Sequence, residues 1–83
     1  MTYTFEFRPA ALKDLAELSP DVAQRVVDKI EQMRNDLAGD VKRLKNFVPR
    51  YRLRVGDWRV LFEITGTLIE IWRVRHRRDV YDR

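Results

Sequence analysis

The sequence contains no cysteine and only one histidine, His76. The absence of cysteine excludes a disulfide framework, a thiolate metal site and a cysteine nucleophile. A single histidine cannot supply the cluster that a histidine-bound zinc ion needs, so we expect neither a metal nor another cofactor. Long apolar runs are also missing, and the first residues form neither a basic leader nor an apolar signal core. We therefore expect no membrane segment and a cytoplasmic location.

The length and the composition predict one folded domain. Eighty-three residues leave no room for a second hydrophobic core. Hydrophobic residues make up 45% of the chain, which is enough to build one core and argues against disorder. We expect a single domain that spans residues 1–83.

Positive charge is concentrated in the second half of the chain. Residues 1–41 carry five Lys and Arg against eight Asp and Glu, whereas residues 42–83 carry twelve against five. This uneven distribution of charge favours a binding face for an acidic partner. The most common polyanion in cells is nucleic acid. The alternative is that these cations are ordinary solvated surface residues. Their preference for arginine and their regular placement favour binding.

The first forty residues predict one strand followed by two helices. Residues 2–8 alternate apolar and polar side chains, which is typical of a half-buried strand. Apolar residues then recur every three or four positions over residues 10–18 and again over residues 22–37, as in amphipathic helices. Ser19 is suited to cap the start of the second helix, and Gly39 its end. The matching apolar faces predict a helical hairpin that packs on a sheet.

The second half predicts a loop and three strands. Residues 40–49 mix cations with a few apolar anchors and read as a partly packed loop. The strands are expected over residues 51–55, 58–64 and 68–75, with glycine-containing turns between them. In the third strand the alternation of apolar and polar residues shifts by one position midway, and a β-bulge would account for this shift. The order β-α-α-β-β-β predicts an α+β fold, with the helical hairpin packed on one face of a small, mainly antiparallel sheet.

Basic and apolar side chains alternate in the strand over residues 51–55. Arg52 and Arg54 lie between Tyr51, Leu53 and Val55. This period of two places the cations on one face of the strand while the other face packs in the core. A row of guanidinium groups on a rigid sheet suits a phosphate backbone. Two tryptophans of the following strands, at positions 58 and 72, are expected to be core residues or cross-strand neighbours.

Four stretches together resemble the RelE/ParE superfamily of type II toxins, and the resemblance covers nearly the whole chain. These stretches are Pro9-Ala-Ala-Leu-Lys-Asp-Leu15, Leu44-Lys45, Tyr51-Arg-Leu-Arg-Val-Gly-Asp-Trp-Arg59-Val-Leu-Phe62 and Val74-Arg-His-Arg77-Arg-Asp-Val-Tyr81. The resemblance implies a RelE-like fold and a cognate antitoxin partner in a hetero-oligomeric complex. Members of the RelE-like branch cut mRNA in the ribosome. Members of the ParE-like branch inhibit DNA gyrase without cutting anything.

The resemblance to the RelE-like branch also implies a set of site residues. The positions that carry the chemistry in that branch match Arg52, Arg54, Arg59, Arg77 and Tyr81. RelE has lysines at the positions of Arg52 and Arg54, and its stretch between Arg77 and Tyr81 is longer. The remaining cations near these positions are expected to attract phosphates. They are Lys45, Arg50, Arg73, Arg75 and Arg78.

The reaction implied by this branch is attack of a ribose 2′-hydroxyl on the adjacent phosphate, which needs no metal ion. It leaves a 2′,3′-cyclic phosphate and a 5′-hydroxyl. Arg59 and Arg77 are expected to stabilise the phosphorane, because a guanidinium offers forked donors to phosphate oxygens. The general base is left open between His76, Tyr81 and a group from the RNA or the ribosome, since arginine holds its proton too tightly. We expect a ribosome-dependent mRNA endonuclease. The alternatives are a gyrase inhibitor and an inactive nucleic-acid-binding module.

Overall fold

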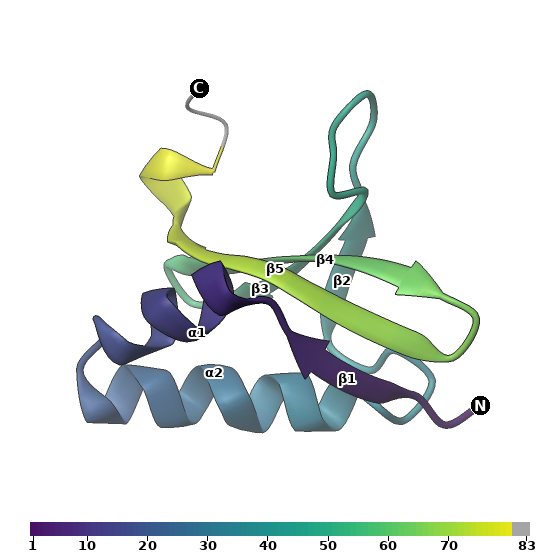
Figure 1. Ribbon diagram of the computed structural model, residues 1–83, viewed down its shortest axis with the longest axis horizontal. Helices are drawn as coiled ribbons and strands as arrows, with labels where there is room; N and C mark the ends of the chain where they lie inside the picture. Colours follow the sequence, from purple (N-terminus) through teal and green to yellow (C-terminus); the bar gives the residue numbers. More distant parts are fainter. Residues whose placement is uncertain (81–83) are drawn as a thin grey trace.

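The computed structural model describes residues 1–80 and contains a five-stranded sheet with two helices (Figure 1). The elements, in chain order, are β1 (Thr4–Phe7), α1 (Pro9–Ala16), α2 (Pro20–Met33), β2 (Asp40–Arg43), β3 (Tyr51–Val55), β4 (Trp58–Thr65), β5 (Leu68–His76) and the 3₁₀-helix η1 (Arg77–Asp79). The strand order is β1-β5-β4-β3-β2, and only the β1–β5 pair is parallel. The α+β fold class and the order of the predicted elements are confirmed.

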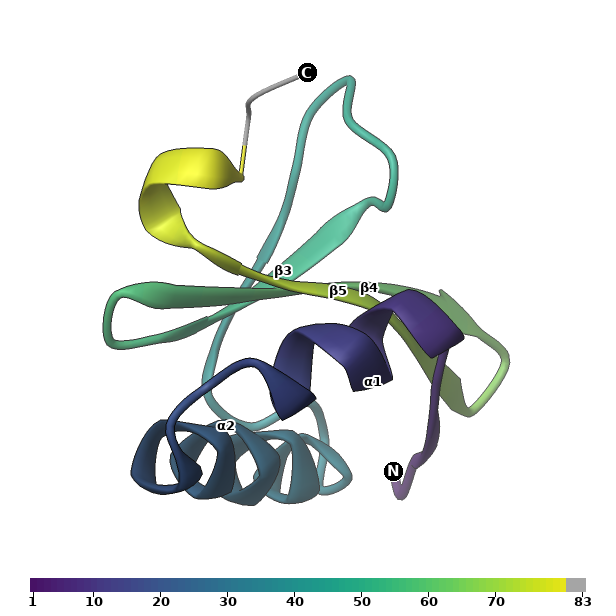
Figure 2. The ribbon, with the colours of Figure 1, turned by 60° about the vertical axis from the view of Figure 1, so that its left-hand side comes forward.

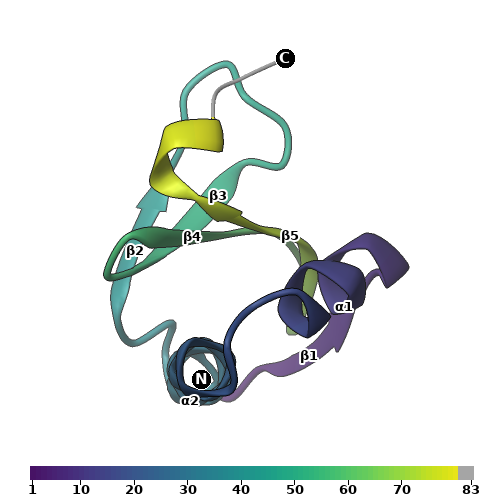
Figure 3. The same cartoon turned by 90° about the vertical axis from the view of Figure 1, so that its left-hand side faces the viewer.

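Both helices lie on the same face of the sheet (Figures 2 and 3). The apolar positions of α2 face β3, while α1 packs against β5 and β1. The core between the helices and the sheet consists of eleven buried residues. They are Ala11, Val26, Ile30, Met33, Leu53, Val55, Val60, Phe62, Ile69, Ile71 and Val74. Antiparallel sheets often bury one face and leave the other to solvent, and this sheet does so over most of its area.

The opposite face is flanked by two segments that rise from the sheet. The loop between β2 and β3 stands on one side and η1 on the other, as Figures 1 and 2 show. A small apolar cluster of Leu44, Leu61 and Val80, with Phe47 packed against it, lies between them. We call this side of the sheet the open face. It is a shallow trough with an apolar patch at its centre.

Three local expectations from the sequence are wrong. Asp40–Arg43 is not loop but the edge strand β2, which pairs antiparallel with β3. Its single half-buried apolar residue, Val41, gives too weak an alternation to mark a strand in the sequence. Helix α2 ends at Met33, so Leu37 lies beyond the helix in a left-handed conformation with a φ of 58°. Ser19 occupies the N-cap position of α2, but its side chain makes no capping hydrogen bond.

A β-bulge lies between Leu61 and Phe62 of β4, where the register to β5 shifts. Leu61 pairs with Arg73 and Phe62 pairs with Ile71, so Trp72 is the extra residue. This bulge accounts for the shift in the alternation of apolar and polar residues that the sequence shows in β5. It also shows that the two tryptophans are not cross-strand neighbours, because the partner of Trp58 in the register is His76. Trp58 packs against the core, which is the other position expected for it. Within the described residues, no helix is long and apolar enough to span a membrane.

Replacing Phe62 with Ala should lower the free energy of unfolding by about 3–5 kcal/mol, because the side chain is fully buried and its loss leaves a cavity. Its ring also stacks on Tyr51 at a centroid distance of 5.6 Å. Urea denaturation followed by circular dichroism measures the change. The control is Leu12→Ala, since Leu12 is 53% exposed on α1 and should change stability by less than about 0.5 kcal/mol. Equal effects of the two substitutions would contradict this description of the core.

Candidate functional site

Three arginines lie side by side across the open face. The register pairs Arg54 of β3 with Arg59 of β4, and Arg59 with Arg75 of β5. Directly paired residues project to the same face of an antiparallel sheet, so these three side chains form one row. Like charges in directly opposite positions destabilise a sheet. We call these residues the arginine row. Its repulsion would be relieved by a bound anion.

A second row runs beside the first, two residue pairs further from the turn between β3 and β4. It consists of Lys42, Arg52, Leu61 and Arg73, from β2, β3, β4 and β5 respectively. Leu61 is buried in the apolar patch of the open face, whereas its neighbours in this row are cationic. The two rows together give the open face a strongly basic end with an apolar centre.

The basic end also includes the turn between β3 and β4. Arg54 precedes this turn and is 57% exposed, with Asp40 3.9 Å away. Arg59 follows it and donates to the carbonyl oxygen atoms of Gly56 and Trp58 at 2.8 and 3.0 Å. The backbone N–H of Arg77 donates to the carbonyl of Asp57 at 2.7 Å, in the same turn. The chain thus brings Arg54, Arg59 and Arg77 to one end of the sheet.

The carboxylates near Arg54 and Arg77 hold them only weakly. The Arg77 guanidinium is 62% exposed and lies 3.8 Å from the carboxylate of Asp57. Long, exposed ion pairs of this kind contribute little to stability because water screens both charges. A phosphate group could therefore replace Asp40 or Asp57 as the partner of these guanidinium groups at small cost.

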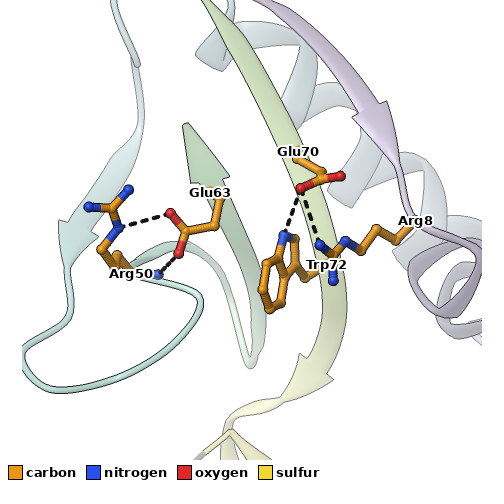
Figure 4. Close-up of polar contacts among 5 residues, drawn as sticks. All are labelled: Arg8, Arg50, Glu63, Glu70 and Trp72. Carbon is orange, nitrogen blue, oxygen red and sulfur yellow. Dashed lines mark hydrogen bonds and ion pairs between the residues drawn. The ribbon is translucent and has the colours of Figure 1, made fainter. Parts of the chain in front are cut away.

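Other predicted cations are engaged in closer contacts. Arg50 donates to the carboxylate of Glu63 through Nε at 2.9 Å and through its backbone N–H at 2.8 Å (Figure 4). Arg52 donates to the backbone carbonyl and the carboxylate of Asp40, at 2.9 and 3.1 Å. These contacts fix the start of β3 and the edge strand β2. Arg50 and Arg52 therefore support the architecture of the site as well as its charge.

The remaining predicted cations lie on the two flanking segments. Lys45 is exposed on the loop between β2 and β3, next to the buried Leu44. The backbone N–H of Arg78, in η1, donates to Nδ1 of His76 at 3.2 Å. Both cations therefore lie on the flanking segments and not in either row.

Arg73 is locked by Asp14 of α1. The carboxylate of Asp14 is only 11% exposed and accepts hydrogen bonds from Arg73 at 2.8 and 3.0 Å and from the backbone N–H of Val74 at 2.8 Å. The hydrogen bonds from Arg73 to Asp14 raise the pKa of the guanidinium, and Coulombic attraction acts in the same direction against partial burial. Among the described residues, no strand pairs with β5 on this side beyond Ile71, since β1 ends at Phe7. Asp14 therefore closes the open edge of β5 just before the residues of the site.

His76 does not join the arginine row. Its imidazole packs edge-on against Trp58 at a centroid distance of 5.3 Å, and Trp58 packs on the core beneath the helices. It lines a hollow of about 380 Å³ that is also bordered by Asp14, Glu17 and Asp79. The alternation of β5 places His76 on the side of Val74, away from Arg75. The predicted Tyr81 lies outside the described residues.

Two acidic residues of this region were missed by the sequence analysis. Asp14 lies on a short helix 59 residues before Arg73, and nothing in its local pattern separates it from a solvated carboxylate. Asp40 was assigned to a loop, although in the structure it lies opposite Arg54 at the start of β2. The signal that would have placed Asp40 is the register of an edge strand, and this strand was not recognised.

Comparison with known proteins gives one consistent result. A family model described as the ParE toxin of the parDE type II toxin–antitoxin system matches residues 5–81. The curated toxin RelE3 of Methanocaldococcus jannaschii is 35% identical over 81 residues, covering 92% of each chain. Among solved structures, the RelB-RelE antitoxin–toxin complex from Methanococcus jannaschii has 32% identity and a TM-score of 0.75, covering 92% of this chain and 94% of the other. The RelBE2 toxin–antitoxin complex from Mycobacterium tuberculosis has 28% identity and a TM-score of 0.79, covering 93% and 100%.

Replacing Asp14 with Ala should lower the free energy of unfolding by about 2–3 kcal/mol, because it leaves Arg73 and the N–H of Val74 without their acceptor. Chemical denaturation measures the change. The control is Glu31→Ala, which removes an exposed pair with Arg34 and should cost less than about 0.5 kcal/mol. A loss no larger than that of the control would mean that Asp14 does not hold the edge of β5.

Proposed function

The chain belongs to the RelE/ParE superfamily of type II toxin–antitoxin toxins, and we propose that it is a ribosome-dependent mRNA endonuclease. The observation that carries this proposal is the arginine row, in which Arg54, Arg59 and Arg75 lie side by side on three neighbouring strands. A protein that only needed a stable sheet would not gain from three like charges in directly opposite positions. A phosphodiester on this row would make the same charges favourable.

The proposed reaction is attack of a ribose 2′-hydroxyl on the adjacent phosphate. The new O–P bond closes a 2′,3′-cyclic phosphate, and the bond to the 5′-oxygen of the next nucleotide breaks. Negative charge gathers on the phosphorane oxygens during this step, so preorganised cations lower the barrier. We assign this role to Arg59 and Arg77, with Arg54 orienting the phosphate. Each guanidinium can donate two parallel N–H groups to a phosphate.

The proton of the 2′-hydroxyl needs an acceptor other than arginine, which stays protonated. We do not assign this role to His76, because its ring packs on Trp58 in a hollow that carboxylates border. The acceptor in this proposal is Tyr81 or a group that the RNA or the ribosome supplies. Dependence on the ribosome follows naturally from the second possibility.

A cognate antitoxin is the partner that the solved relatives support, since each of the two is a toxin–antitoxin complex. We propose that residues 1–83 act as one domain and that an acidic segment of the antitoxin covers its arginine row. Such a segment would supply the carboxylates that Arg54 and Arg77 have only at long range. Neutralisation would then be competition between carboxylates and phosphates for the same guanidinium groups.

A second candidate is inhibition of DNA gyrase without cleavage. The description of the matching family model, which names the ParE toxin, favours it. This function would also use a basic face, but it gives no reason for three arginines to lie in directly opposite positions of neighbouring strands. The mRNA endonuclease therefore remains the proposed function.

Replacing Arg59 or Arg77 with Ala should lower the rate of mRNA cleavage by about 10²-fold or more, as expected for the loss of one group that stabilises the transition state. Primer extension on translated messages, from cells that express each variant, measures the cleavage. Lys29→Ala is the matched control, because Lys29 is an exposed cation on α2 and away from the open face. Cleavage at the wild-type level in both arginine variants would remove these residues from the assigned roles.

The same experiment separates the two candidate functions. Breaks in phase with codons, confined to translated messages, support the endonuclease. Intact messages together with double-strand breaks in the chromosome would refute it and support the gyrase inhibitor.

A further inference from the structure

A second hollow, of about 350 Å³, lies on the open face beside the arginine row. Its walls come from the loop between β2 and β3, from the bulged parts of β4 and β5, and from the segment after η1. The lining residues are Phe47, Val48, Pro49, Leu61, Trp72, Arg73, Arg75 and Val80. We call it the open-face hollow. Its volume is at the lower end of the range for pockets that hold small organic groups.

The indole of Trp72 is held as a rigid wall of this hollow. The guanidinium of Arg8 lies over the ring at 3.6 Å from its centroid. One oxygen of Glu70 accepts a hydrogen bond from the Trp72 indole N–H at 3.1 Å and from Arg8 at 3.4 Å (Figure 4). Since Arg8 covers one side of the indole, the hollow borders its other side or its edge. A planar ring fixed in this way loses little freedom when a second planar group stacks on it.

Arginines are the charged residues among the described lining of the open-face hollow, and of these Arg73 is paired with Asp14. The lining includes two arginines, and no acidic side chain occurs among the described residues that form it. The hollow around His76 shares both arginines but is lined by three carboxylates, Asp14, Glu17 and Asp79. Of the two hollows, the open-face hollow therefore suits a group that belongs to a polyanion.

Arg75 connects this hollow to the arginine row, because it is a member of both. A phosphate held by Arg59 and Arg75 would place the attached nucleoside next to Trp72 and the apolar wall. Recognition of single-stranded RNA commonly combines such a cationic track with aromatic rings and arginine planes on which splayed bases stack.

We propose that the open-face hollow binds one unstacked base of the single-stranded RNA whose backbone lies on the arginine row. This inference rests on the proposed function for its substrate. It adds that the base next to the scissile phosphate contributes to binding through Trp72. It also assigns Arg8 and Glu70 as positioning residues for that ring.

The direct test uses a short single-stranded RNA with 2′-O-methyl riboses, which cannot be cut by 2′-hydroxyl attack. The protein carries Trp58→Phe, so that Trp72 is the only tryptophan that emits. The RNA should quench this emission. Replacing one base at a time with an abasic ribose keeps every phosphate, and at one position it should remove the quenching and weaken binding about tenfold. An RNA that does not quench, or abasic RNAs that all bind equally well, would overturn the inference.

A surface variant checks the position of the hollow without disturbing the fold. Val48 lines the hollow and is 69% exposed, so Val48→Glu should fold normally while it places a carboxylate beside the bound base. We expect about tenfold weaker binding of the intact RNA and no further loss with the abasic RNA. Leu12→Glu changes the net charge equally at an exposed position of α1 and should bind as tightly as the parent protein. Equal binding by both variants would place the base elsewhere.

The two proposals can fail separately. If the parent protein leaves mRNA intact in cells but shows base-dependent quenching, the endonuclease proposal fails and the hollow stands as a base site. If the parent protein cuts mRNA and Val48→Glu cuts at the same positions and rate while binding RNA normally, the endonuclease stands and the hollow is refuted.

Discussion

Burial of one face of the sheet beneath α1 and α2 determines where the arginines of β3 and β4 point. Leu53 and Val55 are almost completely buried in the core, and Val60 packs beside them. With side chains alternating every residue, Arg54 and Arg59 must then project to the open face. A slip of one residue would exchange the two sets and bury guanidinium groups under the helices, which is far more costly than their mutual repulsion. The core therefore holds the arginine row together against its own charge.

The open edge of β5 is the point at which this arrangement would otherwise loosen. The parallel strand β1 pairs with β5 only as far as Ile71, and the two site residues Arg75 and Arg77 come later in the chain. Asp14 fills the gap from α1 by accepting the N–H of Val74 together with the Arg73 guanidinium. The carboxylate of Asp14 thus accepts a backbone hydrogen bond that a neighbouring strand would otherwise accept. The helix that packs the core also fixes the end of the strand that carries the site.

The fold and the composition of the basic face could be predicted because both follow from local periodicity. The period of two over residues 51–55 and the helical spacing over residues 22–33 are visible without any long-range information. The contact between Asp14 and Arg73 could not be predicted, since it joins residues 59 positions apart through the packing of α1 on β5. The position of Trp72 depends on a bulge that is set by pairing with β4 and not by the sequence of β5 alone.

The position of His76 affects which group can act as the general base in the proposed reaction. A histidine between two arginines in the sequence is an attractive general base, yet alternation along β5 places its ring against Trp58 and outside the arginine row. Among the described residues, the open face then presents arginines but no histidine. Such a face is suited to stabilise a phosphorane but poorly suited to start the reaction by removing a proton. The proposed proton acceptor is therefore Tyr81 or a group of the RNA or the ribosome. In the second case the protein would cut RNA efficiently only where that group is held in place.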